Sequence, residues 1–370
     1  MRGVIPPARL ATPDRASAES DAPTLVALLR SAAAHARGAS HGLRFLDRRE
    51  RATFVPWREV AARAGRAAAA LVAHGIRPGE RVAIVHPTGP GFFDAFFGTL
   101  LAGAVPVPLY PPVRLGAMEE YERRTAAMIA AAAARLVMAD RAVSRLLGGV
   151  SARVRPPLGE VCLEDLRAGA GGPLPEPDAG DLGLVQFSSG TTGGPRPVGL
   201  SHAAILHQGR LLNSHWPDRS ELEQAGVSWL PLYHDMGLIG CVVPSMMRPA
   251  NLTLLGPELF IARPALWLRA ISRYRATVSP APNFAYALAV ERIRDEELEG
   301  VDLSTWRAAL NGAEMVSGPV LRAFTERFAR YGLRPEARTP VYGLAEAALA
   351  VTCSPLGRAW RSARFERRRL

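Results

Sequence analysis

The sequence predicts an α/β protein with mostly parallel sheets and helices on both faces. Short apolar runs that suit buried strands, such as 81–86 and 135–140, alternate with segments whose apolar residues recur at helical spacing. This alternation favours a parallel sheet whose faces are covered by helices. Several predicted strands run into turns that carry glycine and one polar residue, at the strand ends where open α/β sheets bind ligands.

Composition narrows the function classes. A chain of 370 residues is long enough for about two to three domain-sized units or one large α/β domain. The hydrophobic share of 48% is typical of a globular protein, and the net charge of +11 comes from arginine alone, since there is no lysine. The arginines are scattered and only 361–370 forms a dense run, so we expect no nucleic-acid partner.

Cysteine usage and hydropathy indicate the compartment. Cys162, Cys241 and Cys353 are widely spaced and match no metal or disulfide framework, which favours a reducing cytoplasm. No apolar run approaches the roughly 20 residues of a membrane span, so no such span is expected. Residues 1–22 lack an apolar signal core and are predicted to form a loose leader.

The part of the chain from 23 to 180 is predicted to form a first α/β subdomain. Its periodicity indicates a hairpin over 43–55, strands or extended segments over 81–86, 105–112 and 135–140, and helices over 23–37, 57–74, 91–101 and 117–134. Residues 168–182, rich in glycine, proline and acid, are predicted to link it to a second subdomain over 181–357.

A glycine-rich loop lies at the centre of the second subdomain. The apolar run Leu184 to Phe187 suits a buried strand, a helical pattern begins at Ala203, and small hydroxyls alternate with glycines between them, at Ser188, Ser189, Gly190, Thr191, Thr192, Gly193 and Gly194. Strand, loop and helix in this order suit phosphate binding, because glycines let backbone N–H groups approach an anion. A Walker A loop is excluded by the missing lysine, and a plain surface turn remains the alternative reading of the loop alone.

Four further strand-end turns follow the loop. We expect a strand through WLPLYH, 229–234, to place His234 and Asp235 at the carboxyl end of the sheet. Segment 276–290 is predicted as strand, turn and helix start, and 306–317 as a strand that runs into a glycine turn with Glu314. The last turn holds Tyr342 and Gly343, with Glu346 after it. Each turn alone would be unremarkable, and an isolated His-Asp pair is more often a structural cap.

Taken together, the motifs resemble the adenylate-forming, AMP-forming acid-activating superfamily. Its phosphate loop is similar to SSGTTGGPRPVGLSH (188–202), and its downstream nucleotide motif is similar to YGLAE (342–346). The fatty acyl-AMP ligases and the related long-chain fatty acyl-CoA ligases are most similar to VPVPLYPP, WLPLYHDMGLIG, APNFAYAL and NGAEMV. The resemblance spans about 24 to 357. It implies the large N-terminal domain of such an enzyme.

The resemblance also implies site residues and cofactors. Activation of a fatty acid would use ATP and Mg²⁺, with the metal on Glu346 and the carboxylate beside His234, and Arg196 would be catalytic. The ATP site would comprise Ser188, Ser189, Gly190, Thr191, Thr192, Gly193, Gly312, Ala313, Glu314, Tyr342 and Gly343. An apolar tunnel would take the acyl chain, with Trp229, His234, Met236 and Phe284 as substrate-binding residues and Phe187, Leu232, Leu238, Ile239 and Met315 as further wall candidates.

The sequence departs from the family pattern in the loop and in length. Arg196-Pro197 stands where the family usually has Lys-Gly, so a fork-shaped cation replaces an ammonium and one backbone donor is lost. Ala345 stands where the family usually has a hydroxyl. Residues 358–370 are expected to form an arginine-rich tail, and the family's ribose-binding strand and C-terminal lid domain with its catalytic lysine are expected to be absent.

Four interpretations therefore stay open for the chain by itself. It is a weak or inactive part of a fatty acid ligase, half of a split enzyme that needs a separate C-terminal domain, a non-catalytic module that binds nucleotide or acyl groups, or a nucleic-acid binder that uses the arginine-rich tail. In a complete enzyme the acyl group would pass to coenzyme A or to an acyl-carrier protein.

We predict little fatty-acid-dependent ATP–pyrophosphate exchange by the purified chain, because it has no lysine to stabilise the charge that develops on the phosphates. Exchange is measured by incorporation of labelled pyrophosphate into ATP. Robust exchange that depends on added fatty acid would contradict this expectation.

Overall fold

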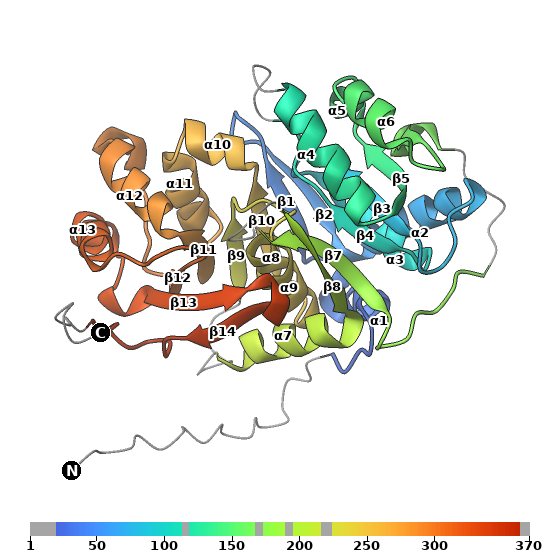
Figure 1. The fold of residues 1–370 in the computed structure, drawn as a ribbon. Coiled ribbons are helices and arrows are strands. Elements are labelled where there is room, and N and C mark those ends of the chain that lie inside the picture. The colour runs from blue at the N-terminus through green and yellow to red at the C-terminus, as the bar shows by residue number, and fades with distance from the viewer. Residues whose placement is uncertain (1–19, 113–117, 167–172, 189–194, 216–223, 363–370) are drawn as a thin grey trace, which may run out of the picture.

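The computed structural model describes residues 20–112, 118–166, 173–188, 195–215 and 224–362. It confirms the α/β class, with three sheets and helices packed around them (Figure 1). Most of the leader and residues 363–370 of the tail lie outside the described residues. Among the helices of the described part, none is long and apolar enough to cross a membrane.

The four helices predicted in the first half are confirmed as α1 to α4, with small shifts at their ends. Over all of the described residues the α-helices are α1 Leu25–Ala34, α2 Trp57–Ala73, α3 Pro90–Leu101, α4 Met118–Ala131, α5 Arg141–Ser144, α6 Gly148–Val154, α7 His202–Ser214, α8 Asp235–Gly237, α9 Val243–Met247, α10 Pro257–Ala262, α11 Ala265–Arg273, α12 Asn283–Arg292 and α13 Gly318–Phe328. A π-helix, Leu238–Val242, joins α8 to α9.

The largest sheet has the strand order β14-β13-β12-β11-β9-β10-β1-β2. Its six inner strands pair in parallel, and β2 and β14 pair antiparallel at the two edges. The strands are β1 Gly42–Leu46, β2 Ala52–Pro56, β9 Ala225–Ser228, β10 Asn251–Leu255, β11 Val278–Pro282, β12 Ala308–Gly312, β13 Arg338–Leu344 and β14 Leu349–Cys353. Because β1 pairs with β10, strand pairing crosses the predicted division between 180 and 181.

A second, smaller sheet is entirely parallel and lies within the first half of the chain. Its order is β4-β3-β5-β6, formed by β3 Arg81–Val85, β4 Val105–Pro108, β5 Ala134–Ala139 and β6 Glu160–Cys162. Helices α2 and α3 pack closely beside it, and a Cβ added at Gly98 would lie only 2.6 Å from Cβ of Ala67. These parallel strands confirm the prediction of parallel pairing.

The predicted order of strand, loop and helix around the glycine-rich segment is wrong in one respect. Strand β7 Leu182–Ser188 pairs antiparallel with β8 Arg196–Ser201, and helix α7 begins only after β8 (Figure 1). The loop therefore connects a hairpin. Val198 and Leu200 alternate along β8 and pair with Gln186 and Leu184, which gives the apolar residues of β7 a partner strand. Residues 189–194 lie outside the described residues.

The core beside the large sheet is rich in aromatic residues. Trp267 is fully buried, and its indole N–H donates to the hydroxyl of Ser279 at 2.8 Å. Its ring meets those of Trp306 and Tyr286 edge to face, with centroids 5.3 and 5.5 Å apart. Such pairs favour this geometry, so α11, α12 and α13 are fixed against β11 and β12.

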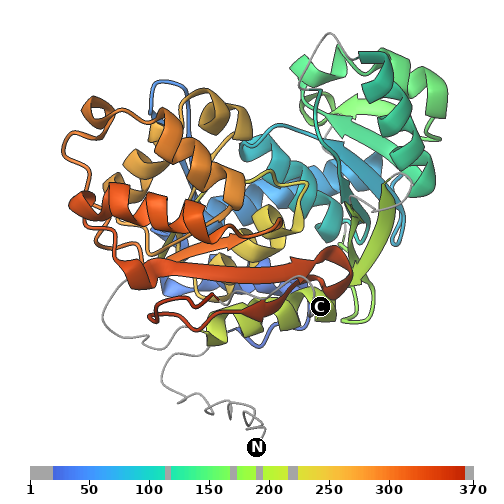
Figure 2. The same cartoon turned by 60° about the vertical axis from the view of Figure 1, so that its left-hand side comes forward.

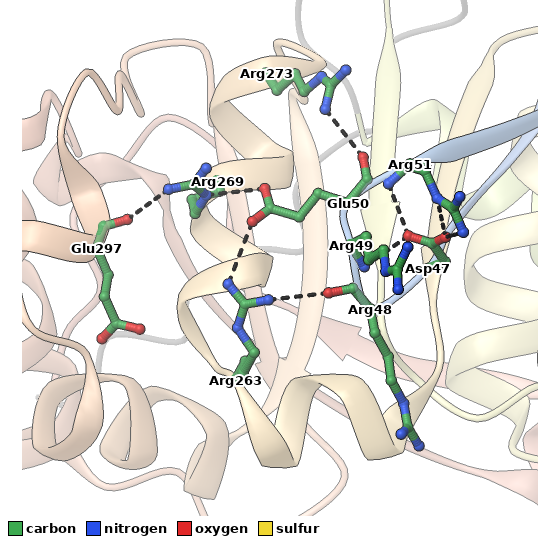
Figure 3. Close-up of polar contacts among 9 residues, drawn as sticks. All are labelled: Asp47, Arg48, Arg49, Glu50, Arg51, Arg263, Arg269, Arg273 and Glu297. Atoms are coloured by element: carbon green, nitrogen blue, oxygen red, sulfur yellow. Dashed lines mark hydrogen bonds and ion pairs between the residues drawn. The ribbon is translucent and has the colours of Figure 1, made fainter.

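Arginines attach the tip of the β1–β2 hairpin to α10 and α11 (Figure 3). Glu50, at φ 58°, accepts from Nε of Arg269 at 3.0 Å, and its backbone carbonyl accepts from Arg273 at 3.2 Å. Arg263 reaches the backbone carbonyl of Arg48 at 3.1 Å. The arginine side chains are about half exposed, so each ion pair adds little stability, and their combined effect is to fix the hairpin's direction.

A buried histidine connects the N-terminal helix to the segment after the hairpin. Nδ1 of His202 accepts the backbone N–H of Leu25 at 3.2 Å, and only 2% of the residue is exposed. Burial lowers the pKa of His202 below the ordinary histidine value of 6.5, because it penalises the charged form. Protonation would also remove the acceptor that Leu25 uses.

We predict that the free energy of unfolding falls as the pH drops below about 6.5, where the unfolded chain takes up a proton at this position more readily than the folded chain does. His202→Asn keeps an acceptor near the position of Nδ1 and should reduce this fall, as measured by urea unfolding at pH 7 and pH 5. His207→Asn, an exposed position on the same helix, is the matched control and should leave the fall unchanged. Equal pH dependence in the His202→Asn variant and the parent chain would contradict the prediction.

Candidate functional site

A cavity of about 690 Å³ lies against the large sheet, between it, the β7–β8 hairpin and the π-helix. The predicted turns meet around it. Its wall includes eight of the predicted site residues: Ser188, Arg196, His234, Met236, Ala313, Tyr342, Gly343 and Glu346. These residues come from five separate segments, so the fold brings together side chains that lie up to 158 positions apart in the chain, from 188 to 346.

Close packing between β12 and β13 shapes one side of the cavity mouth. A Cβ at Gly312 would lie 2.6 Å from Cγ2 of Val341 and 2.8 Å from its carbonyl oxygen, so only glycine fits there. The chain then turns through Ala313, which has a left-handed φ of 66°. Gly312 itself is buried behind the wall, whereas Ala313 lines the cavity.

Glu314 lies beside the cavity and is absent from its wall. Its side chain is exposed, and Oε1 accepts the backbone N–H of Phe284 at 2.6 Å. A carboxylate at the first turn of α12 satisfies an N–H that has no partner within the helix. Its visible contact is therefore a cap that ties the turn after β12 to α12.

The β13–β14 hairpin supplies the opposite rim. Tyr342 is 61% exposed, Gly343 follows it in β13, and the short 3₁₀ helix Ala345–Ala347 carries the exposed Glu346. Gly343 packs against the backbone of Leu349, where a side chain would collide. Both Tyr342 and Glu346 thus project from a tightly packed hairpin at the edge of the cavity.

His234 and Asp235 follow β9 across a turn. The strand ends at Ser228, so the expectation of a strand through 234 is wrong: a tight turn closed by the bond from the His234 N–H to the Pro231 carbonyl takes the chain to α8 instead. Nδ1 of His234 lies 2.6 Å from Oδ1 of Asp235, which also accepts the N–H of Met236 at 2.6 Å. Nδ1 of His234 also accepts the backbone N–H of Met236 at 3.3 Å, so His234 caps α8 and its ring is held at the start of this helix.

The phosphate-loop residues are placed only at the two ends of the loop. Ser188 ends β7 and pairs in register with Arg196 at the start of β8, and both line the cavity. Arg196 is exposed, so its guanidinium is available to an anion. Ser189, Gly190, Thr191, Thr192 and Gly193 lie outside the described residues, and their predicted roles stay predictions.

The interior of the cavity is largely apolar and extends towards the N-terminal ends of the strands. Phe187 and Met236 line it as expected, together with residues that the sequence did not point to: Leu109, Met128, Gly226, Cys241, Leu252, Val278, Ala308 and Leu310. Cys241 belongs to the π-helix, its thiol donates to the carbonyl of Met236, and burial raises its pKa to about 12. Such π-bulges often occur at functional sites.

Several expected wall residues do not line this cavity. Trp229 is buried in the aromatic core, where it stacks on Phe260 with centroids 3.9 Å apart, and Phe284 packs edge-on against it. Leu232, Leu238 and Ile239 belong to the packed core, and Met315 is 90% exposed. The sequence could not separate these positions, because an apolar side chain beside a cavity looks the same as one in a core.

The described side chains do not form a complete coordination sphere for a metal ion. In the part of the chain that the structure describes, no group of three or more histidine, cysteine, aspartate or glutamate side chains could hold an ion. Glu346 offers one exposed carboxylate at the mouth. Mg²⁺ commonly binds through one or two carboxylates with phosphate oxygens and waters, so this donor fits it only together with a phosphate-bearing substrate.

Known proteins are similar to this chain in sequence and in fold. The chain is 36% identical over 328 residues to the long-chain-fatty-acid–AMP ligase FadD26 of Mycobacterium marinum, covering 87% of this chain and 55% of that protein. A solved structure of fatty acyl-adenylate ligases from E. coli and L. pneumophila superposes with a TM-score of 0.85 at 32% identity, covering 91% of this chain and 60% of that one.

A second solved structure is the L. pneumophila fatty acyl-adenylate ligase in complex with acyl adenylate and pyrophosphate. It superposes with a TM-score of 0.83 at 30% identity and covers 92% of this chain and 58% of that one. The chain thus spans somewhat more than half the length of these relatives. The family model described as AMP-binding enzyme matches residues 33–366, and the chain accordingly belongs to the AMP-binding enzyme family.

Proposed function

We propose that this chain is the acid- and nucleotide-binding part of an enzyme that activates a fatty acid with ATP. One observation carries the proposal: a single cavity joins a polar mouth, at the carboxyl ends of parallel strands, to an apolar interior. Family membership and the fatty acyl-AMP ligases among the relatives support it.

In the proposed reaction a carboxylate oxygen of the acid attacks the α-phosphorus of ATP. The new bond is the carboxyl oxygen–phosphorus bond of a mixed carboxylic–phosphoric anhydride, the bond from the α-phosphorus to the bridging oxygen breaks, and pyrophosphate leaves with the electron pair. The protein contributes mainly positioning and charge stabilisation. Coenzyme A or an acyl-carrier protein would accept the acyl group in a second step.

The mouth residues divide this work. Arg196 is the cation beside Ser188 and would bind phosphate oxygens through its fork of N–H donors. Tyr342 offers an exposed ring for adenine to stack on, and the glycine turn at Gly312–Ala313 would face the same base. Glu346 would hold Mg²⁺, which supplies positive charge to the phosphates.

His234 would position the carboxylate. Its Nδ1 accepts the backbone N–H of Met236 and lies 2.6 Å from Oδ1 of Asp235, so these contacts hold the ring on its Nδ1 side and leave Nε2 on the other side. The side chain is half exposed and lines the cavity between the polar mouth and Met236. Such a fixed imidazole suits orienting one oxygen of the acid while the acyl chain occupies the apolar interior.

We predict that Gly226→Leu lowers the affinity for long-chain acids and leaves short-chain acids less affected. A Cβ at Gly226 would lie 2.9 Å from Leu252 and 3.9 Å from Val278, both of which line the cavity, so a larger side chain fills its deep end. If the new side chain keeps two methylenes of a long acyl chain from being buried, at about 0.8 kcal/mol each, the long-chain analogue should bind roughly tenfold more weakly. Calorimetric titration of non-hydrolysable acyl-adenylate analogues with long and short chains measures this.

The matched control for this prediction is Gly65→Leu, on α2 with no heavy atom within 4 Å of the added Cβ. It should leave the affinity for both analogues unchanged. Equal weakening of the long and the short analogue by Gly226→Leu would argue against an acyl role for the deep end.

We also predict that Glu346→Gln raises the Mg²⁺ concentration needed for ATP binding by on the order of tenfold, because a neutral amide oxygen is a poorer ligand for a hard cation. Fluorescence titration of an ATP analogue at several Mg²⁺ concentrations measures it. Glu336→Gln, an exposed position outside the cavity wall, serves as control. An unchanged Mg²⁺ requirement in Glu346→Gln would remove this residue from the proposed site.

A further inference from the structure

A glutamine side chain is buried in the wall of the cavity without a polar partner. Gln186 lies in β7, is 2% exposed and lines the cavity. Neither Oε1 nor Nε2 has a hydrogen-bond partner in the part of the chain that the structure describes. The role proposed above for the mouth residues does not use this amide.

An unpaired buried amide is costly, and the site offers a simple way to avoid the cost. Moving an amide from water into the protein without a new hydrogen bond costs free energy. A leucine of similar size carries no such cost. On its own face of the hairpin, the neighbours Leu184 and Val198 are apolar. Since the described residues supply no partner, a group that enters the cavity can supply one.

The position of Gln186 along β7 sets how far inside the cavity it acts. Side chains alternate along a strand, so Gln186 shares a face with Ser188, about 7 Å closer to the mouth. The deep end of the cavity is lined instead by residues at the starts of other strands, such as Ala225 and Ala308. Gln186 thus lies opposite the part of a bound acid near its carboxyl group.

We propose that Gln186 is a specificity-determining residue that hydrogen-bonds an oxygen substituent near the carboxyl end of the acyl chain. An amide offers one acceptor and two donors, which complements a hydroxyl or a carbonyl group. The cavity then takes fatty acids oxygenated within the first few carbons in preference to unsubstituted ones. This inference rests on the proposed function, since it assumes that an acyl chain enters the cavity from the polar mouth.

The test compares three acids of one chain length on the full chain. Dodecanoic, 3-hydroxydodecanoic and 12-hydroxydodecanoic acid are titrated as non-hydrolysable acyl-adenylate analogues, and the dissociation constants are measured by calorimetry. The parent chain should bind the 3-hydroxy analogue about tenfold more tightly than the unsubstituted one. The 12-hydroxy analogue should gain nothing, because its hydroxyl lies far from Gln186.

Gln186→Leu should abolish the preference for the 3-hydroxy analogue and bind the unsubstituted analogue at least as tightly as the parent chain does. Gln186→Met is a second variant of similar volume, used if the leucine variant does not fold. Gln208→Leu is the matched control: Gln208 is 4% exposed with an unpartnered Nε2 and does not line the cavity, so its loss should not change selectivity.

The possible outcomes separate the inference from the function on which it rests. An unchanged ratio between the 3-hydroxy and unsubstituted analogues in Gln186→Leu overturns the inference and means that the amide holds only water. Loss of affinity for all three analogues alike also overturns it. If the parent chain binds none of them, the proposed function itself fails. A preference that disappears in Gln186→Leu and persists in Gln208→Leu supports the inference.

Discussion

The parallel register of β11, β12 and β13 is the constraint on which the site depends. Parallel pairing places the carboxyl ends of these strands on one edge of the sheet, so the turns after them must meet. The pairing is tight enough that Gly312 cannot carry a side chain. Any residue with a Cβ there would separate β12 from β13 and move Ala313 and Tyr342 apart. The geometry of the mouth is thus a consequence of backbone packing.

The cavity exists because this part of the large sheet is not covered by a closely packed helix. Elsewhere α11 and α13 pack directly on the strands through large aromatic residues such as Trp267 and Phe324. Beside the cavity the cover includes the β7–β8 hairpin and the π-helix, whose residues Gly240 and Cys241 line it. Figures 1 and 2 show the hairpin between the large sheet and the smaller, all-parallel sheet. Small residues on both sides of the gap, including Gly226 and Ala308, leave space that long side chains would close.

Much of the fold could be predicted, because its signals are local. The 3.6-residue spacing of α2 and the apolar run of β3 each indicate an element without reference to the rest of the chain. The error at β8 has a physical cause: Arg196–Ser201 is strand only because β7 needs a hydrogen-bonding partner, and six residues with two apolar positions carry little periodicity. The pairing of β1 with β10, more than 200 residues away, leaves no local signal at all.

The polar residues of the site could be predicted from the sequence, whereas the apolar residues that line the cavity could not. Polar residues in the glycine-bearing turns, such as His234 and Glu346, do line one cavity. Residue type could not separate Trp229 and Phe284 from residues that line a cavity. Packing places Trp229 in the aromatic core with Phe284 against it, and neither lines the cavity. Gln186 did carry a signal, a polar residue inside the apolar run 184–187, but its meaning depends on the burial that only the fold shows.

The distribution of charge in the cavity sets the direction in which a ligand can lie. The exposed ionisable groups that line the mouth, Arg196, His234 and Glu346, are all near the carboxyl edge of the sheet, where water can solvate them. Past Met236 the wall is largely aliphatic, and Gln224 and Arg248, shortly before the starts of β9 and β10, line the cavity as well. Under the proposed function, an acid would keep its carboxylate at the mouth, and its tail would extend towards the starts of β9 and β12. That orientation would bring the carboxylate beside the edge at which Ser188 and Arg196, the two ends of the hairpin loop, would offer donors to a phosphate.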